Sequence, residues 1–291
     1  MTIEKIDTSN AKFYEKFILN NTIGQNTLAF GAKAGEFACG IILAEKSEEE
    51  IDQWDIKVFF ISQIFRYQSI GPALIKLLIN TLKEKGCKKI IFQAVTSKKS
   101  IDELGRFLYK YGFSKPELLT VIYRFNPDVL LKNNSFVKSA YTSIFTCPKN
   151  VKIVSINEID PPLLDKIKNN ETLHFPDNLS PFANEHDLSA TNTWFAITDQ
   201  NEIVGWITGL SAPGDIILYR SFFVREDYRN SALGFFIINK AIKFHAEQYK
   251  NKQALCAIAI DNEKTLKFLS LYFKNLYEHK KYEFFTFIDL D

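Results

Sequence analysis

The chain has 291 residues, of which 46% are hydrophobic and 24% charged, and its formal net charge is +2. This balance excludes an electrostatic case for binding nucleic acid or an anionic membrane, and no apolar run approaches the roughly 20 residues that cross a bilayer. The four cysteines form no Cys-x-x-Cys pair, so neither a disulfide framework nor a metal site is expected. A cytoplasmic protein without a signal peptide is expected, with two domains at roughly 100–200 residues each.

The first half of the chain opens with a short strand and a helix, over residues 1–6 and 10–21. Two strand candidates follow within residues 27–46, and Gly35 supplies the turn between them. An apolar run rich in β-formers occupies residues 56–65. This order predicts a sheet of short strands flanked by helices.

A turn and an amphipathic helix follow that run. The turn carries Arg66 and Gly71, and the apolar residues after it share one helix face. Gly86 is expected to end the helix, and residues 87–95 are typical of a short buried strand. Two strands joined through a helix are expected to pair in parallel, with a right-handed crossover.

The second half repeats this order at a fixed spacing. Arg229 follows Arg66 by 229 − 66 = 163 residues, and Gly234 follows Gly71 by 234 − 71 = 163. A repeat at one spacing indicates duplicated units of structure. The strand, turn, helix and strand of the first half therefore have counterparts in the second.

The counterparts are two strands within 193–210, an apolar run at 216–224 and a strand at 250–258. A connector with Pro, Asn and Ser at 126–150 separates the halves. We expect an α/β chain of two tandem domains, a first domain at 1–148 and a second at 149–291. Each would be a mixed, mainly antiparallel sheet flanked by helices.

The repeated turn favours an anion site. Backbone N–H groups at a helix start, aided by the helix dipole, attract phosphate, and an Arg at the entrance adds a charged donor. The alternative is that each glycine only permits a tight turn between strand and helix. No Walker A or Rossmann glycine pattern is present.

The turn and its flanks resemble motif A of the GNAT superfamily of acyl-CoA N-acyltransferases, Arg/Gln-x-x-Gly-x-Gly/Ala. The second copy consists of Arg229, Asn230, Ser231, Ala232, Leu233 and Gly234. In the first copy, Arg66, Ser69 and Gly71 take the equivalent positions. Each copy replaces the first glycine of the motif with a small residue, Ser69 or Ala232. Such residues restrict the backbone to negative φ more than glycine does.

The resemblance implies two tandem GNAT-like domains and acetyl-CoA as cofactor. The turn would bind its pyrophosphate, and the pantetheine arm would lie between splayed strands. Contacts are expected at the backbone of Phe223 and Val224, and at Asn262 through the family pattern after the fifth strand. Pro72 removes an N–H from the first copy, so the second domain is the expected site. The first domain would be degenerate, or would shape the acceptor pocket.

The resemblance also implies attack by an amine on the thioester, with a base and an acid that move protons. Leu269 occupies the family's tyrosine position, and Tyr272, on nearly the same helix face, is the candidate acid. His174 is the candidate base, with His186 as a second choice. Packing and surface roles remain the alternatives for these residues.

Two further residues stand out by position. Arg220 lies inside an apolar strand and would either recognise a substrate carboxylate or sit at an edge. His245, on the helix after the turn, is expected to face solvent.

The leading hypothesis is an acetyl-CoA-dependent N-acetyltransferase that acts on the amine of an unidentified small molecule. A non-catalytic CoA-binding or scaffold protein of the same fold is the runner-up. Longer acyl chains or a charged-tRNA donor form a third reading, and the small net charge argues against tRNA. Pairing with a second copy as a homodimer is left open.

Overall fold

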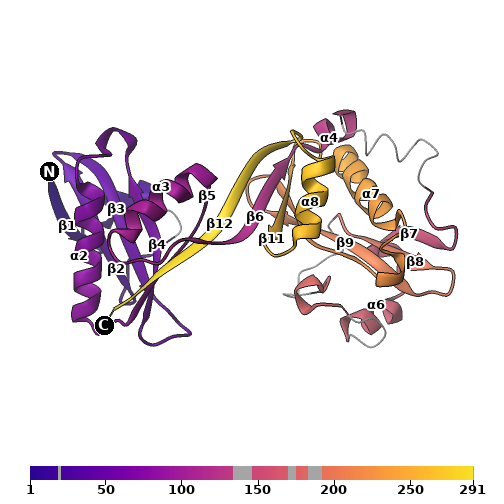
Figure 1. Ribbon diagram of the computed structural model, residues 1–291, viewed down its shortest axis with the longest axis horizontal. Coiled ribbons are helices and arrows are strands. Elements are labelled where there is room, and N and C mark those ends of the chain that lie inside the picture. The colour runs from indigo at the N-terminus through magenta and orange to yellow at the C-terminus, as the bar shows by residue number, and fades with distance from the viewer. Residues whose placement is uncertain (19–20, 134–145, 170–174, 183–191, 291) are drawn as a thin grey trace. The chain divides into compact units, whose positions relative to one another are not determined.

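The computed structural model describes residues 1–18, 21–133, 146–169, 175–182 and 192–290 (Figure 1). Contacts between Cα atoms divide the chain into two compact units. Unit 1 comprises Met1–Leu119 together with Tyr282–Asp291, and unit 2 comprises Thr120–Lys281.

Unit 1 contains a sheet with the strand order β1-β2-β3-β4-β5-β12. Neighbours run antiparallel, except that β4 and β5 are parallel. The strands are β1 (Thr2–Ile6), β2 (Thr27–Ala34), β3 (Phe37–Lys46), β4 (Gln53–Ile61), β5 (Lys89–Thr96) and β12 (Tyr277–Asp289). The helices are α1 (Glu15–Ile18), α2 (Ile70–Glu84) and α3 (Lys98–Tyr109).

The apolar face of α2 explains its place in the core of unit 1. Leu74, Leu78 and Leu82 are fully buried against the sheet, as the spacing of three or four residues requires. Gly86 ends the helix with a φ of 75°, a value that glycine adopts without steric cost. The predicted helix end is therefore confirmed.

Unit 2 contains a sheet with the strand order β6-β11-β10-β9-β8-β7. Only β10 and β11 pair in parallel among its described strands. The strands are β6 (Glu117–Phe125), β7 (Val151–Ser155), β8 (Trp194–Thr198), β9 (Ile203–Ala212), β10 (Ile216–Val224) and β11 (Gln253–Ala259). The helices are α4 (Pro127–Asn133), α6 (Pro161–Lys168), α7 (Leu233–Gln248) and α8 (Glu263–Tyr272).

The two faces of this sheet carry different helices. Buried residues of α7, such as Ile237, pack with Ala196 and Val204 on one face. Leu163 of α6 packs with Phe195 on the other. Figure 1 shows α7 and α6 on opposite sides of these strands. Adjacent residues of β8 thus face opposite layers, as the period-two pleat of a strand requires.

Equivalent strands of the two repeats exchange partners. Adding the 163-residue spacing to residues 117–125 gives residues 280–288, which lie within β12, so β6 corresponds to β12. However, β12 pairs with β5 over eight residues from Tyr282 to Asp289, whereas β6 pairs with β11 from Thr120 to Phe125. Each repeat therefore completes its sheet with the strand of the other.

The packing units consequently differ from the expected domains 1–148 and 149–291. Because of the exchange, residues Thr120–Lys281 belong to unit 2, and residues Tyr282–Asp291 belong to unit 1. A duplication boundary near residue 148 stays a prediction about the repeat itself. The predicted fold class is confirmed, since both sheets are mixed, mainly antiparallel and flanked by helices. Among the described residues, no helix has the length and apolar character that a membrane crossing needs.

Candidate functional site

Strands β10 and β11 separate partway along their length. They pair in parallel from Ile216–Gln253 to Tyr219–Cys256, and no further pair follows. Strand β10 continues beside β9 as far as Val224. One edge of β10 therefore lies open after Tyr219, while its other edge remains in the sheet.

A β-bulge at Arg220 marks the point of separation. Tyr219 pairs with Gly209 and Ser221 with Thr208, so Arg220 is the extra residue. Unit 1 repeats the feature, because Lys57 is skipped between the pairs of Ile56 and Val58 with β3. Since 220 − 57 = 163, the repeat includes the bulge and a basic residue on it. Arg220 is thus a bulge residue rather than a strand end.

A cavity of about 830 Å³ opens where the strands part. Its described walls come mainly from β10, β11, α7 and α8, with contributions from β6 and α4, all within unit 2. Most of the lining side chains are apolar. Three cations line it, Arg220, Arg229 and Lys264, and no Asp, Glu or His among the described residues does.

The open edge of β10 carries the backbone groups of alternate residues. The N–H groups of Ser221 and Arg225 point toward β9, where they donate to Thr208 Oγ1 and the Val204 carbonyl. Alternation then directs Phe223 toward β9 and directs Phe222 and Val224 toward the cavity. The expectation of cofactor contacts at both Phe223 and Val224 is thus corrected: Phe223 pairs with Trp206, is buried, and does not line the cavity.

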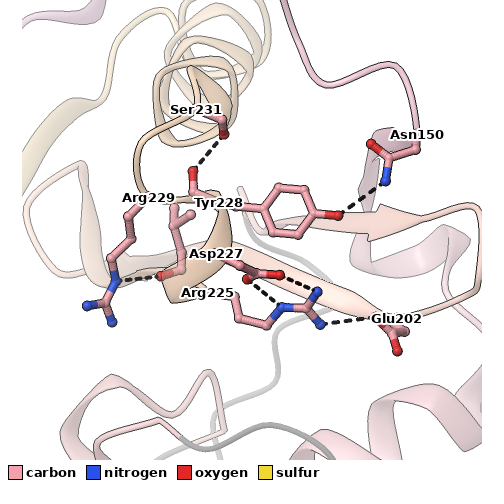
Figure 2. Close-up of polar contacts among 8 residues, drawn as sticks. Asn150, Glu202, Arg225, Asp227, Tyr228, Arg229 and Ser231 are labelled. Carbon is pink, nitrogen blue, oxygen red and sulfur yellow. Dashed lines mark hydrogen bonds and ion pairs between the residues drawn. The ribbon is translucent and has the colours of Figure 1, made fainter.

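The turn between β10 and α7 is held by a cluster of polar contacts (Figure 2). Arg225 binds both carboxylate oxygens of Asp227 at 2.8 Å and reaches Glu202 at 3.0 Å. These bonds raise the pKa of Arg225, and the guanidinium lowers the pKa of Asp227. Tyr228 accepts a hydrogen bond from Asn150 Nδ2 at 3.2 Å. The turn is therefore fixed before any ligand binds.

Arg229 and Ser231 make contacts within the same turn (Figure 2). Arg229 Nε donates to the Val224 carbonyl at 3.1 Å, as Arg66 Nε does to Ile61 at 3.3 Å in unit 1. Ser231 Oγ donates to the Tyr228 carbonyl at 2.6 Å. The arginine of the motif thus ties the strand end to the turn in both copies.

The amides of the second turn fall into two groups. Those of Ser231 and Leu233 donate to Tyr228 O and Ser231 Oγ. Those of Ala232 and Gly234 have no protein acceptor among the described residues, and both residues line the cavity. Asn230 does not line the cavity, and Leu233 is fully buried in the core. Of the predicted turn contacts, Arg229, Ser231, Ala232 and Gly234 are the ones that reach it.

The two copies of the turn differ in backbone conformation. Ser69 adopts a φ of 61° and Tyr67 a φ of 64°, whereas Ala232 has a φ of −75°. The expected restriction to negative φ therefore holds for Ala232 and fails for Ser69. A positive φ at a serine is uncommon and strains the backbone.

Aromatic side chains pack beside the equivalent turn of unit 1. Phe59 of β4 stacks on Phe107 of α3 with ring centroids 5.7 Å apart. A Cβ added to Gly71 would lie 3.4 Å from the Phe107 ring and 3.1 Å from Ile61. These side chains bring α3 against the start of α2, and the degeneracy of the first copy stays a prediction.

The predicted catalytic residues have different outcomes. Tyr272 ends α8, lines the cavity and is 47% exposed, with its ring 5.1 Å from that of Phe268. His174 and His186 lie outside the described residues. Asn262 also lines the cavity, and its side chain caps α8 by accepting from the Thr265 N–H at 3.2 Å.

His245 is buried, so its predicted exposure to solvent is wrong. Its Nε2 lies 2.9 Å from the Lys252 carbonyl, which only accepts, so this nitrogen carries the proton. Nδ1 is then the acceptor from the Tyr219 hydroxyl at 2.8 Å. Burial lowers the pKa of His245 and raises that of Tyr219.

Three hydrogen bonds of Asn192 complete this network. Asn192 is fully buried and donates through Nδ2 to the Tyr219 hydroxyl at 2.6 Å and to the Ala241 carbonyl at 2.8 Å. Its Oδ1 accepts from Trp194 Nε1 at 2.6 Å. Sequence patterns gave no signal for this network, because its members come from three separate segments. Within the described part of the chain, no group of three or more His, Cys, Asp or Glu could hold a metal ion.

Comparisons with known proteins agree with this geometry. Residues 161–272 match the model of the acetyltransferase (GNAT) family. No curated protein matches the sequence. A tandem GNAT protein from the clavulanic acid biosynthesis pathway, solved without AcCoA, is similar in structure at a TM-score of 0.59 and 11% identity, over 98% of each chain.

A GCN5-related N-acetyltransferase from Sphaerobacter thermophilus is similar at a TM-score of 0.60 and 12% identity. The similarity covers 96% of this chain and 86% of the chain of that protein. At such low sequence identities, the similarity concerns the fold alone. Residues 161–272 thus match the GNAT family, and the fold of the chain as a whole is similar to that of tandem GNAT proteins.

Proposed function

We propose that the protein is an acyl-CoA-dependent N-acyltransferase that acts on the amine of a small molecule. Acetyl-CoA is the donor that the family resemblance predicts, and unit 2 is the proposed site. The observation that carries the proposal is the open edge of β10, which lines a cavity that also includes the turn at Arg229–Gly234. An extended pantetheine arm fits an open strand edge, because its amides can pair with backbone groups on that edge.

The charges around the cavity support an anionic ligand. Arg229 and Lys264 are cations of its lining, and the amides of Ala232 and Gly234 are without described acceptors. Backbone donors at a helix start combined with cations bind phosphate well. We assign the pyrophosphate to this turn and the arm to the edge formed by Phe222 and Val224.

The proton transfers are assigned to two residues. Tyr272 would protonate the leaving thiolate, since it lines the cavity from the end of α8. His174, which lies outside the described residues, would accept the amine proton. A phenol and an imidazole have suitable chemistry for these roles.

Matched substitutions at the two turns test the site. Gly234→Asp places a carboxylate at the proposed pyrophosphate site, and Gly71→Asp places one at the equivalent position of unit 1. A Cβ at either position lies 3.1 Å from its nearest side-chain carbon, in Phe222 or Ile61. The steric effects are therefore comparable, and Gly→Ala at each position measures them.

Calorimetric titration with CoA is the measurement. We expect Gly234→Asp to weaken binding tenfold or more, about 1.4 kcal/mol, relative to Gly234→Ala. Gly71→Asp is expected to bind like wild type. If Gly71→Asp alone weakens binding, the site is in unit 1, and if wild type binds no CoA, the proposed function fails.

A non-catalytic CoA-binding protein is the second candidate. It is favoured by the lack of Asp, Glu or His among the described lining residues, since these are the usual bases. Release of free CoA thiol from acetyl-CoA in the presence of a panel of small amines separates the two. Binding without thiol release from any amine supports this second candidate.

A further inference from the structure

The cavity of unit 2 continues past the point where β10 and β11 join. Ala254 lines it, yet Ala254 pairs with Ile217, two residues inside the paired region. An arm that lies between the open strand edges must stop at the last pair, Tyr219–Cys256. The part of the cavity beyond that pair lies beside one face of the sheet, next to Ala254 and α7, and is continuous with the part along Phe222 and Val224.

This inner space, here called the apolar lobe, has walls of hydrocarbon and aromatic side chains. It is bounded by α4, α7, β6, β11 and the end of α8, through the residues Phe125, Leu130, Ala241, Ile242, Ala254 and Phe273. Phe125 and Phe273 pack edge to face, with their ring centroids 5.9 Å apart. Every side chain that defines the lobe is apolar, so it suits a hydrocarbon and offers nothing to a polar group.

Unit 1 shows what fills the same volume when no lobe is needed. The last parallel pair before the bulge is Ile56–Phe92 in unit 1 and Tyr219–Cys256 in unit 2, so Phe92 corresponds to Cys256. Two residues earlier, Ile90 corresponds to Ala254.

On the helix, Leu78 corresponds to Ala241 through the 163-residue spacing. Leu78 and Ile90 are fully buried. Phe92 is 5% exposed, and its ring centroid lies 5.9 Å from that of Phe284. Unit 2 thus has a smaller residue at each of three core positions. Large-to-small changes in a core leave a cavity where neighbouring side chains do not fill it, and all three smaller residues of unit 2 line the cavity.

We propose that the apolar lobe holds the acyl chain of the donor, and that this donor carries an aliphatic chain longer than acetyl. The inference rests on the proposed acyl-CoA site and names its donor class. With the pantetheine arm along Phe222 and Val224, the acyl group reaches the last strand pair, and a longer chain continues between β11 and α7. A two-carbon group leaves the lobe empty.

Binding of a homologous series tests the proposal without knowledge of the acceptor. CoA, acetyl-CoA, butyryl-CoA, hexanoyl-CoA and octanoyl-CoA are titrated calorimetrically into the full chain. Burial of one methylene is worth about 0.8 kcal/mol, so the Kd is expected to fall up to about fourfold per added methylene until the lobe is full. Equal or rising Kd values along the series overturn the inference while leaving the proposed function intact. Failure of every ligand to bind overturns the proposed function itself.

Substitutions that copy unit 1 locate the chain in the lobe. Cys256→Phe, Ala254→Ile and Ala241→Leu each restore the larger residue. Each is expected to lower the preference for octanoyl-CoA over acetyl-CoA tenfold or more. Cys147→Phe makes the same replacement at the other partly exposed cysteine of unit 2, which does not line the cavity, and is expected to keep the wild-type preference.

The ratio of two ligands is measured on the same protein, so a general loss of folded protein does not alter it. Should Cys256→Phe fail to fold, Ala241→Leu and the wild-type series still decide the outcome. An undiminished octanoyl preference in the folded variants would show that the chain lies elsewhere.

Discussion

Tyr219 and Ser221 lie two residues apart on β10, yet their side chains face opposite sides of the sheet. The Tyr219 hydroxyl meets His245 of α7, whereas Ser221 Oγ accepts from Trp206 Nε1 at 2.9 Å in the layer that contains α6. Regular alternation would place both side chains on one face. The bulge at Arg220 shifts the register by one, so a single strand end supplies polar groups to both layers.

Ser221 is expected to stabilise the layer on its side of the sheet. Its hydroxyl also donates to the Leu179 carbonyl, which ties residues 177–179 to the sheet. Ser221→Ala should lower the free energy of unfolding by about 1–2 kcal/mol, because buried polar partners lose a bond. Urea denaturation is the measurement. The exposed Ser270→Ala is the control, and an equal effect of both would contradict the prediction.

His245 is expected to make stability depend on pH. Burial lowers its folded pKa, so the unfolded chain binds the proton more readily, near its ordinary pKa of about 6.5. Stability is then fully present above that value and falls as the pH drops through it toward the folded pKa, by up to about 1.4 kcal/mol per pH unit. Urea denaturation at a series of pH values from neutral to acidic measures this slope.

A matched pair of variants identifies the source of the slope. His245→Gln should remove it, whereas His279→Gln, at an exposed position, should keep it. The described groups that interact with His245 are Tyr219, Tyr249, Lys252 and Asp128. Burial, the largest effect, lowers the pKa of His245. The hydrogen bond to the Lys252 carbonyl and the charge of Asp128 raise it, and the charge of Lys252 lowers it. An unchanged slope in His245→Gln would assign the titration to another group.

Phe284 is expected to stabilise unit 1, although it lies near the end of the second repeat. It is fully buried, packs edge to face on Phe92 and belongs to the core of unit 1. Phe284→Ala should cost about 3–5 kcal/mol. Hydrogen exchange should show faster exchange at β5 while β10 keeps its protection. Faster exchange confined to β10 would contradict the strand exchange described here.

Asn262 combines two roles that substitutions can separate. Asn262→Ala removes the cap of α8 and should lower stability by about 1 kcal/mol. Asn262→Asp keeps a capping oxygen but adds a negative charge to the cavity wall, so CoA should bind more weakly at unchanged stability. Thermal unfolding and calorimetry give the two quantities. Unaltered CoA binding by Asn262→Asp would leave only the capping role.

Local patterns predicted a good part of this architecture. The βαβ units, the turn at Gly35, the helix end at Gly86 and the Arg–Gly turn follow from residue types with strict backbone preferences. Val224, Arg229 and Gly234, for which the sequence predicts cofactor contacts, line the cavity, and the contacts themselves stay a prediction. His245 was misplaced because α4 also packs against α7, so a second face of that helix is covered.

By itself, the sequence determined the duplication, the order of elements in each copy and the repeated turn. These depend on the chemistry of neighbouring residues, which a spacing of 163 makes visible. Only the tertiary structure decided that β12 joins β5 and β6 joins β11, and that Ala241, Ala254 and Cys256 line one cavity. Equivalent strands carry similar local patterns, so the choice of partner and the space between layers depend on contacts between segments far apart in the chain.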